Sequence, residues 1–385
     1  MANSPTKPAT TPRWGQPPWA IEFHPQPHFL PAQVDFAIVG GGFTGLSAAA
    51  WLRRLDPTKS VVLFEGGSIG AGASGRTGGM ALAESAVGDL PGLGDVLAGY
   101  KQILNDLEIH CDQQFPRAWE LARQGALPES PISWQDFGTL SAVKAVPGGT
   151  VDPGKVVSGL ARAAERAGAQ IHEYCRVEDV AFEEPLRLYI ASPNIAHLDV
   201  EGHTMHAQQV LFACNAESLE LSGLAGHADP KLTLALATEP LSTAQLEAIG
   251  LASGKPFYTV DFPYLWGRLL PNNGVIFGCG LVEVNNWRGL IDLDVATGES
   301  AKLLAHLETR VHGLHPALRN VAFTHRWGGP ILIGEDWSPV FRRHPLTPRA
   351  IVLGAYSGHG VALSVYLGRW AAEVMLGKKA LPNWD

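Results

Sequence analysis

The 385-residue chain has few cysteines and no long apolar run. Its four cysteines, Cys111, Cys175, Cys214 and Cys279, are scattered and include no C-x-x-C pair, so they predict neither a metal site nor an obvious disulfide framework. Because free thiols persist in a reducing compartment, we expect a cytoplasmic protein. The lack of any run of about 18 apolar residues excludes a membrane-spanning helix. Residues 1–11 also lack the apolar core of a signal peptide.

Basic residues are too few to dominate the charge, which is formally −8. A nucleic acid or an anionic membrane surface is therefore not expected as a partner. Histidines such as His24, His28 and His203 show no paired spacing, so no metal site is predicted. The remaining composition is that of a globular protein, and the length favours two or three domains with ample core.

A glycine-rich turn follows the first apolar run of the chain. The run Phe36–Val39 predicts a strand buried on both faces of a parallel sheet. Gly40, Gly42 and Gly45 then form G-x-G-x-x-G, and Leu46–Leu55 predicts a helix. In this motif the first glycine makes a tight turn, the second lets a pyrophosphate approach the backbone, and the third lets the helix lie close to the strand.

The context of this motif favours a dinucleotide site over a turn that binds nothing. A second apolar run, Val61–Phe64, ends at Glu65. Glu65 lies about 20 residues beyond Gly45, where an acidic residue can accept hydrogen bonds from a ribose.

A second glycine-dense loop spans residues 70–80 and contains Ser74 and Arg76. Glycines allow backbone to approach a flat or charged ligand, and both side chains can reach phosphate or ring oxygens. The alternatives are a plain flexible loop and, for Arg76, a surface salt bridge.

Four sites fall where predicted strands end, namely Gly40–Gly45, Glu65, Ala213–Ala216 and Gly354–Gly360. Ligands of open α/β sheets bind at the carboxyl ends of strands. We therefore predict an α/β fold with a discontinuous Rossmann-like domain of residues 32–96, 150–221 and 326–385. Residues 97–149 and 222–325 are expected to form a second, mostly antiparallel substrate domain with helices on one side.

Several local elements accompany this division. Leu97–Gln124 is expected to be helical with an interruption near Pro116, and Trp134–Ala142 is expected to be a strand. A helix is predicted over Pro153–Ala167 with Asp152 as its N-cap. Residues 1–31, rich in proline, form either a disordered leader or an extended arm, and their tryptophans favour an arm that packs from Trp14 onward.

The sequence resembles the D-amino acid oxidase superfamily of FAD enzymes, and within it the branch that includes γ-glutamylputrescine oxidoreductases. Four stretches carry the likeness: residues 40–49 (GGGFTGLSAA), 70–79 (GAGASGRTGG), 237–241 (ATEPL) and 354–360 (GAYSGHG). Thr77 stands where the branch usually has Asn, and the segment after Trp327 matches only loosely. The loop after Glu65 lacks the His or Cys of relatives that attach flavin covalently. The resemblance thus implies a glutathione-reductase-type domain and dissociable, non-covalent FAD.

The motifs and this resemblance imply a set of FAD contacts. They are Gly40, Gly42, Phe43, Thr44, Gly45, Glu65, Gly66, Ala73, Ser74, Arg76, Thr77, Gly78, Gly79, Met80, Val177, Ala213, Asn215, Gly328, Gly358, His359, Gly360 and Val361. The helix after residue 360 begins near the expected flavin ring, where its N–H groups would stabilise negative charge.

The implied reaction oxidises a C–N bond of a primary or secondary amine or an amino acid by hydride transfer, and the imine is then hydrolysed. A desolvating aromatic pocket would keep the amine neutral. Candidates for its walls, each also compatible with plain core packing, are Tyr258, Tyr264, Trp266, Trp327 and Tyr356.

Two further side chains are candidates for the chemistry. Arg268 could clamp a substrate carboxylate or could be an exposed cation at a strand end. His359 could contact the flavin through its backbone or could act as an acid or base.

The electron acceptor is either O2 or another molecule, and the sequence predicts no oligomeric state. Two alternatives stay open at this point. One is a 2-hydroxy-acid dehydrogenase on the same fold, and the other is a flavoprotein whose FAD is structural and which acts as a subunit or binding partner.

Overall fold

A computed structural model describes residues 13–191, 203–284 and 286–384 of the chain. The first of its two large sheets has the strand order β17–β18–β11–β1–β2–β8. Five of its strands pair in parallel: β1 (Gln33–Val39), β2 (Val61–Phe64), β8 (Gln170–His172), β11 (His203–Phe212) and β18 (Thr347–Gly354). The strand β17 (Val340–His344) closes one edge in the antiparallel sense. All four residues of β2 are buried, as expected for the centre of such a sheet.

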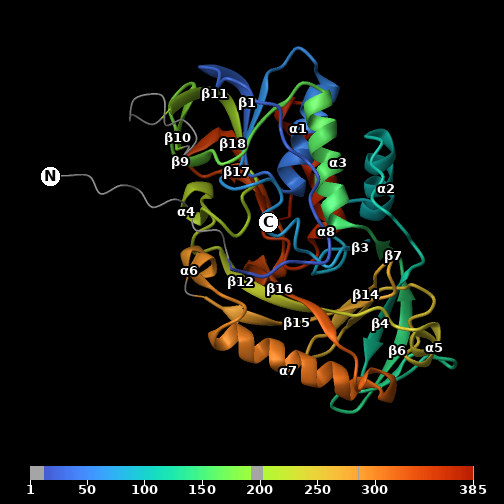
Figure 1. Cartoon of the computed structure of the whole chain (residues 1–385). Coiled ribbons are helices and arrows are strands. Elements are labelled where there is room, and N and C mark those ends of the chain that lie inside the picture. The colour runs from blue at the N-terminus through green and yellow to red at the C-terminus, as the bar shows by residue number, and fades with distance from the viewer. Residues whose placement is uncertain (1–12, 192–202, 285, 385) are drawn as a thin grey trace.

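Helices cover one face of this sheet (Figure 1). They are α1 (Phe43–Leu55), α2 (Val96–Asp106), α3 (Pro153–Arg166) and α8 (Gly360–Met375), and they share one apolar core with β1 and β2. The Asp152 carboxylate accepts the Lys155 N–H at 2.9 Å, which confirms it as the N-cap of α3. Gly168, with a φ of +95°, follows the end of this helix.

A β-hairpin extends the first sheet by pairing with β11. Its strands β9 (Arg176–Ala181) and β10 (Leu186–Ala191) pair antiparallel with each other, and β10 pairs antiparallel with the first half of β11. Alternate residues of β10 are buried, which is the pattern of a strand with one face on the core.

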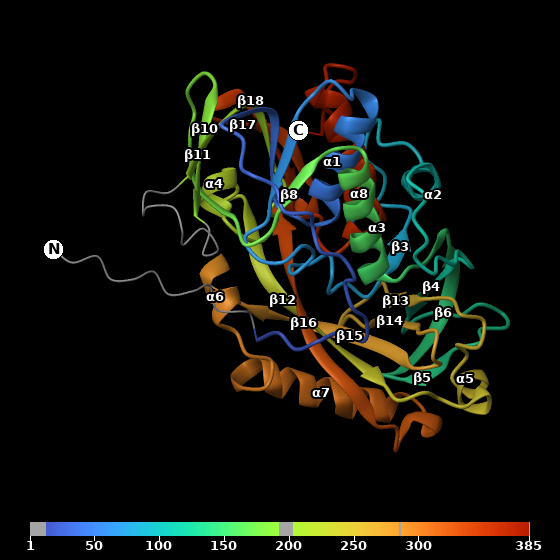
Figure 2. The same ribbon diagram turned by 45° about the horizontal axis from the view of Figure 1, so that its top comes forward.

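The second sheet has the order β16–β12–β15–β14–β13–β4–β6–β5. Its strands are β4 (Ala118–Ala122), β5 (Ser133–Gln135), β6 (Thr139–Val146), β12 (Ala228–Thr238), β13 (Phe257–Thr259), β14 (Trp266–Leu269), β15 (Val275–Glu283) and β16 (Phe323–Gly334). All neighbours pair antiparallel except β13 and β4. The helix α7 (Gly298–Leu314) packs on the face turned away from the first sheet (Figure 1, Figure 2).

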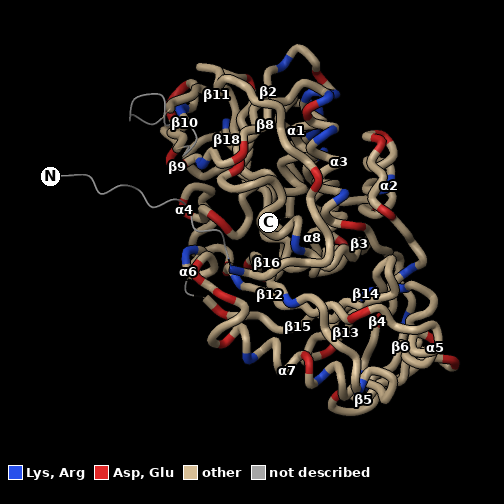
Figure 3. The backbone as a smooth tube through the Cα atoms, viewed as in Figure 1, with Lys and Arg blue, Asp and Glu red and all other residues tan. Residues whose placement is uncertain are grey.

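Smaller elements complete the chain. The two-stranded sheet of β3 (Met80–Leu82) and β7 (Gly148–Thr150) lies where the chain passes between the two large sheets. Short helices are α4 (Leu219–Ser222), α5 (Thr243–Ala248) and α6 (Trp287–Asp292), with one-turn helices at Pro316–Leu318 and Glu335–Trp337. Among the described helices, none has the length and apolarity needed to cross a membrane. Figure 3 shows acidic and basic residues interspersed along both halves.

Three local expectations were wrong. The helix expected over Leu97–Gln124 ends at Asp106, and its second part is the strand β4. Pairing of β4 with β6 and β13 overrides the helical pattern there. The single strand expected over residues 134–142 is a hairpin, because Phe137 and Gly138 turn the chain with positive φ. The strand β16 pairs with β12 through Gly334, so residues 326–334 join the second sheet rather than the first.

The arm packs as expected within its described part, while residues 1–12 lie outside the description. Trp14 is fully buried, and its indole N–H donates to the Leu290 carbonyl at 2.7 Å. The Trp19 indole N–H donates to the Gly75 carbonyl at 2.7 Å. The arm therefore joins the second sheet to the glycine-dense loop of the first.

Candidate functional site

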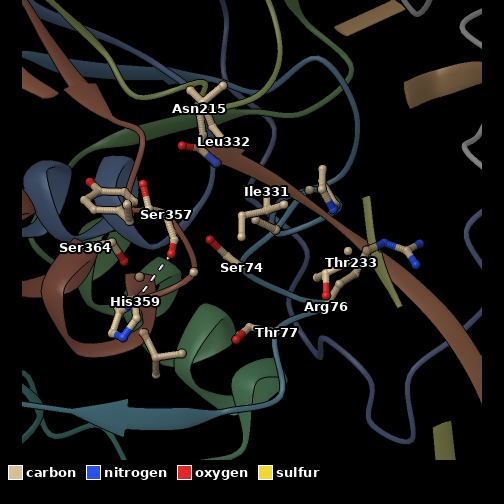
Figure 4. Close-up of a pocket in the computed structure, with 18 of the residues that line it drawn as sticks. Ser74, Arg76, Thr77, Asn215, Thr233, Ile331, Leu332, Ser357, His359 and Ser364 are labelled. Carbon is tan, nitrogen blue, oxygen red and sulfur yellow. Dashed lines mark hydrogen bonds between the residues drawn. The ribbon is translucent and has the colours of Figure 1, made fainter. Parts of the chain in front are cut away.

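A cavity of about 870 Å³ lies between the two sheets. The first sheet borders it with the residues that follow β1, β2, β11 and β18, and the second sheet borders it with residues of β12 to β16. Figure 4 shows side chains of the second and third glycine-rich loops around this space, and the first loop borders the same cavity. The convergence predicted from the ends of the parallel strands is therefore present in the fold.

The turn after β1 owes its shape to glycine at two positions. Gly40 has a φ of +115°, and a Cβ there would lie 2.5 Å from the Ala213 carbonyl oxygen. A Cβ on Gly45 would lie 2.0 Å from the Gly40 carbonyl oxygen, so only glycine lets α1 lie this close to the strand. Gly42 precedes α1, and a Cβ on it would lie 2.8 Å from Ser74 Oγ. The first turn of α1 therefore opens onto the cavity.

Glu65 lies at the end of β2 and supports this turn. Its Oε2 accepts the Gly41 N–H and its Oε1 accepts the Gly67 N–H, each at 2.8 Å. Burial and then the neighbouring Glu217 carboxylate raise the pKa of Glu65 to about 7. Both carboxylates border the cavity, together with Arg176, which lies 3.8 Å from Glu217.

The second glycine loop approaches α1 through Ser74, whose Oγ accepts the Phe43 N–H at 2.9 Å. Arg76 does not point at this position. Its Nε donates to the Ala71 carbonyl at 3.0 Å, its Nη1 donates to the Gly15 carbonyl at 2.7 Å, and it stacks over Trp14. Figure 4 shows its guanidinium turned away from Ser74. In this structure its Nε and Nη1 are therefore bonded to backbone carbonyls of residues 71 and 15, and contact of Arg76 with the cofactor stays a prediction.

The third loop brings the start of α8 to the cavity. His359 precedes the helix, and its ring borders the cavity with Nδ1 3.4 Å from the Ser357 carbonyl oxygen (Figure 4). Burial lowers the pKa of His359, so the ring is neutral near neutral pH. Tyr356 and Thr44 share a hydrogen bond of 2.7 Å, which ties this loop to α1.

Most of the residues expected at the cofactor border this one cavity. They are Gly40, Gly42, Phe43, Thr44, Glu65, Gly66, Ala73, Ser74, Arg76, Thr77, Gly78, Met80, Val177, Ala213, Asn215, Gly358, His359, Gly360 and Val361. Gly45, Gly79 and Gly328 lie behind the cavity wall instead. A Cβ on Gly79 would meet the Val151 carbonyl oxygen at 2.3 Å, and one on Gly328 would meet the Leu232 side chain at 2.7 Å.

Arg268 is buried, so the alternative of an exposed cation at a strand end is wrong. It is 4 % exposed and does not border the cavity, and its Nε donates to the Gly78 carbonyl. Its guanidinium stacks over Trp19, and burial lowers its pKa to about 10. The side chain therefore fastens the second glycine loop to β14, and its contact with a substrate carboxylate stays a prediction.

The aromatic candidates divide into two groups. Tyr258, Tyr264 and Trp266 border the cavity from β13, β14 and the loop between them. Trp327 is 1 % exposed, and its indole donates to the Arg76 carbonyl at 2.9 Å. It touches the cavity but acts mainly as core packing between the arm and β16.

Several bordering side chains were not anticipated. They are Glu84, Glu120, Arg176, Glu217, Phe262, Cys279, Arg310 and Trp337. Glu120 and Arg310 come from β4 and α7, far from any glycine motif. The polar residues of these segments look like solvent-facing positions in the sequence, and no local signal distinguishes them.

Comparison with known proteins shows which family has this arrangement. The family profile described as FAD dependent oxidoreductase (DAO) matches residues 35–374. The chain belongs to this family. The resemblance inferred from the glycine-rich stretches is thereby confirmed, and the protein is an FAD-dependent oxidoreductase with the DAO fold.

The relatives include named enzymes from bacteria. The chain is 26 % identical to the probable oxidoreductase OrdL of Rhizobium meliloti, over 90 % of this chain and 84 % of that protein. It is also 26 % identical to the gamma-glutamylputrescine oxidoreductase of Escherichia coli, over 89 % and 84 % of the two chains. The crystal structure of glycine oxidase from Geobacillus kaustophilus superposes with a TM-score of 0.70 and 19 % identity, covering 92 % of this chain and 97 % of that chain.

The residues of this DAO-family chain fit FAD on their own chemistry. Two helix N-termini, those of α1 and α8, border one elongated cavity, and such termini favour anionic groups. Glu65 supplies a carboxylate for hydroxyl donors. Ser364, in the first part of α8, borders the cavity with a buried hydroxyl that has no hydrogen-bond partner among the described residues. These groups match the phosphates, sugar hydroxyls and polar ring edge of a flavin nucleotide.

Proposed function

We propose that the protein oxidises a C–N bond of a primary or secondary amine or an amino acid, with non-covalently bound FAD. The observation that carries this proposal is the continuation of the cavity beyond the glycine loops. There it runs between the sheets along the rings of Tyr258, Tyr264 and Trp266. The relatives support the same class, since their names include gamma-glutamylputrescine oxidoreductase, glycine oxidase and sarcosine oxidase subunit beta.

In this proposal the two ends of the cavity have separate tasks. The turn of Gly40–Gly42, the carboxylate of Glu65 and Ser74 hold the nucleotide part of the cofactor, while residues 358–361 border its ring. When bound, the flavin accepts a hydride from the carbon beside the substrate nitrogen. The N–H groups at the start of α8 favour the negative charge that develops there.

The aromatic walls prepare the substrate for this step. Hydride leaves readily only from the neutral amine, and a pocket of low polarity lowers the pKa of an ammonium group. The rings also exclude water from the reacting carbon until the imine is released to hydrolysis. His359 is neutral and partly buried, and we assign it a contact with the cofactor through its backbone rather than an acid or base role.

The test uses the purified, FAD-loaded protein mixed without oxygen with amines, amino acids and 2-hydroxy acids. We expect the flavin absorbance to bleach with an amine or amino acid and to stay unchanged with hydroxy acids. A quaternary ammonium analogue of the active amine is the matched control, because it lacks the nitrogen lone pair and should not bleach the flavin. Bleaching by hydroxy acids alone would identify the dehydrogenase alternative, and no bleaching at full FAD loading would identify structural FAD.

The pH dependence gives a second check on the neutral amine. The rate of flavin reduction should rise with pH through the pKa of the bound amine and then level off. A flat profile would contradict this part of the mechanism. Admitting air to the reduced protein then tests the acceptor, since rapid return of the absorbance identifies O2 and slow return identifies another acceptor.

A further inference from the structure

Two carboxylates border the substrate end of the cavity. Glu84 follows β3, and Glu120 lies on β4. The Tyr258 hydroxyl donates to Glu120 Oε1 at 3.0 Å, which fixes that carboxylate beside an aromatic wall. The Glu84 carboxylate has no hydrogen-bond or ion-pair partner among the described residues. The end of the cavity where substrate binds therefore carries two negative groups, and one of them lacks a partner.

The cations that border the cavity do not neutralise these carboxylates. Among the described residues they are Arg76, Arg176 and Arg310. Arg76 is bonded to the arm, and Arg176 faces Glu217 at the nucleotide end. Arg310 donates twice to Asp136, at 2.8 and 2.7 Å, and donates to the Tyr264 and Pro263 carbonyls.

Within the described part of the chain, Lys144 is the remaining cation that acts on both carboxylates. Its Nζ lies 3.9 Å from Glu120 Oε2, and its side chain is 66 % exposed, so water competes for it. Burial and then Glu120 raise the pKa of Glu84, which shows that the two carboxylates repel each other across this space. A cationic ligand group would remove that repulsion.

The surrounding rings independently favour a cation. Tyr258, Tyr264, Trp266 and Phe262 border the same end of the cavity, and the rings of Phe262 and Tyr264 lie 4.2 Å apart. Aromatic faces attract ammonium groups and offer nothing to a carboxylate. Carboxylates and rings together match an ammonium ligand. Among the described residues, each arginine that borders the cavity already contacts another part of the protein, which disfavours a substrate carboxylate here.

We propose that Glu84 and Glu120 bind a second ammonium group of the substrate, distant from the nitrogen that is oxidised. The inference rests on the proposed function and narrows its substrate class to diamines and related polycationic amines that carry no carboxylate at this end. The bound ammonium is the distant one because a carboxylate beside the reacting nitrogen would stabilise its protonated form and oppose hydride transfer.

The experiment compares three four-carbon compounds that differ only at the far end. They are n-butylamine, the α,ω-diamine and γ-aminobutyrate, each mixed anaerobically with the FAD-loaded, full-length protein. We expect the limiting rate constant of flavin reduction divided by the substrate Kd to be at least about tenfold higher for the diamine than for n-butylamine, and lowest for γ-aminobutyrate. Longer diamines extend the series, and the preferred length reports the reach from the reacting carbon to Glu84.

The variant Glu84→Gln tests the assignment of the group. It should reduce this ratio for the preferred diamine by about 10- to 100-fold, mainly by raising Kd, while the ratio for n-butylamine changes by about twofold or less. The matched control is Asp89→Asn, which removes an exposed charge that acts on Glu84 but does not border the cavity. That control should keep the preference for the diamine.

The outcomes separate the two proposals. If no amine bleaches the flavin, the proposed function fails. If amines bleach it but no diamine of any length exceeds its monoamine, or γ-aminobutyrate is the best of the three, the ammonium site is refuted while amine oxidation stands. An equal loss for diamine and monoamine in Glu84→Gln would show a structural role and would also overturn the assignment.

Discussion

The two ends of the cavity are built in different ways. The nucleotide end consists of backbone turns and helix N-termini, brought together by strands of one parallel sheet. The substrate end consists of side chains from β4, β13, β14 and α7, which are separated by long stretches of sequence. Glycine spacing therefore determines the first end, whereas strand pairing and ion pairs determine the second.

This difference implies that a mutation at one end of the cavity should leave the function of the other end intact. A change in the glycine turns should remove the cofactor without altering which substrates the remaining holoenzyme prefers. A change in the side chains of the second sheet should alter stability or preference while flavin content per folded molecule stays the same.

The largest expected effect is at the nucleotide end. In Gly42→Asp, a carboxylate would face the phosphates of the cofactor, and we expect the affinity for FAD to fall by about a thousandfold or more. The measurement is the ratio of flavin to protein after purification, followed by titration with FAD. Gly313→Asp, the same change at an exposed position with nothing within 4 Å of its Cβ, should purify yellow. A yellow, stoichiometric Gly42→Asp protein would place FAD elsewhere.

The next effect concerns the ion pairs behind the substrate end. Asp136 is 4 % exposed and binds both Arg123 and Arg310, which in turn hold the loop that carries Tyr264. Asp136→Asn leaves the largely buried guanidinium of Arg310 without this counter-ion and leaves Arg123 with Asp261 alone, so the free energy of unfolding should fall by about 3–5 kcal/mol.

Denaturant unfolding of the holoenzyme measures this loss, and hydrogen exchange should increase over residues 260–265. The control Asp112→Asn breaks the exposed pair with Lys155, and it should leave the free energy of unfolding nearly unchanged. A large loss of flavin from folded Asp136→Asn would contradict the independence of the two ends.

The smallest expected effect is a pH dependence of the affinity for FAD, caused by the ionisation of Glu65. Hydroxyl donors of the ribose favour the ionised carboxylate, whose pKa is raised to about 7 in the FAD-free protein. The affinity for FAD should therefore rise with pH up to about 7 and level off above it, with a loss of about tenfold one pH unit below. Titration of the FAD-free protein across this range gives the profile.

Two variants sharpen this result. Glu65→Gln should flatten the profile, and Glu178→Gln, at an exposed position, should preserve it. In the FAD-free protein, the raised pKa means that ionised Glu65 destabilises the fold increasingly as pH rises from about 4.5 to about 7. Glu65→Gln should remove that loss of stability. If the stability of the variant still fell with pH as in the original protein, another group would be responsible for the titration.

Sequence reasoning located the nucleotide end because its signals are local. Gly40 and Gly42 occupy a turn that a side chain would block or crowd, and Glu65 follows its strand at the required spacing. The same reasoning did not anticipate the protein contacts of Arg76 and Arg268, since their neighbours in sequence suggest ligand contacts. The partners that occupy these two side chains, Gly15 and Gly78, are supplied by tertiary packing.

The sequence alone determined that this chain has a parallel sheet with glycine turns for FAD, because backbone conformation and helix termini depend on residues close together in the chain. Only the tertiary structure decided the character of the substrate end. Glu84 and Glu120 come from separate segments, and whether a charged residue faces solvent, a counter-ion or a cavity depends on what packs beside it. That pairing of distant segments is what brings two carboxylates and several aromatic rings to the part of the cavity that we propose binds the substrate.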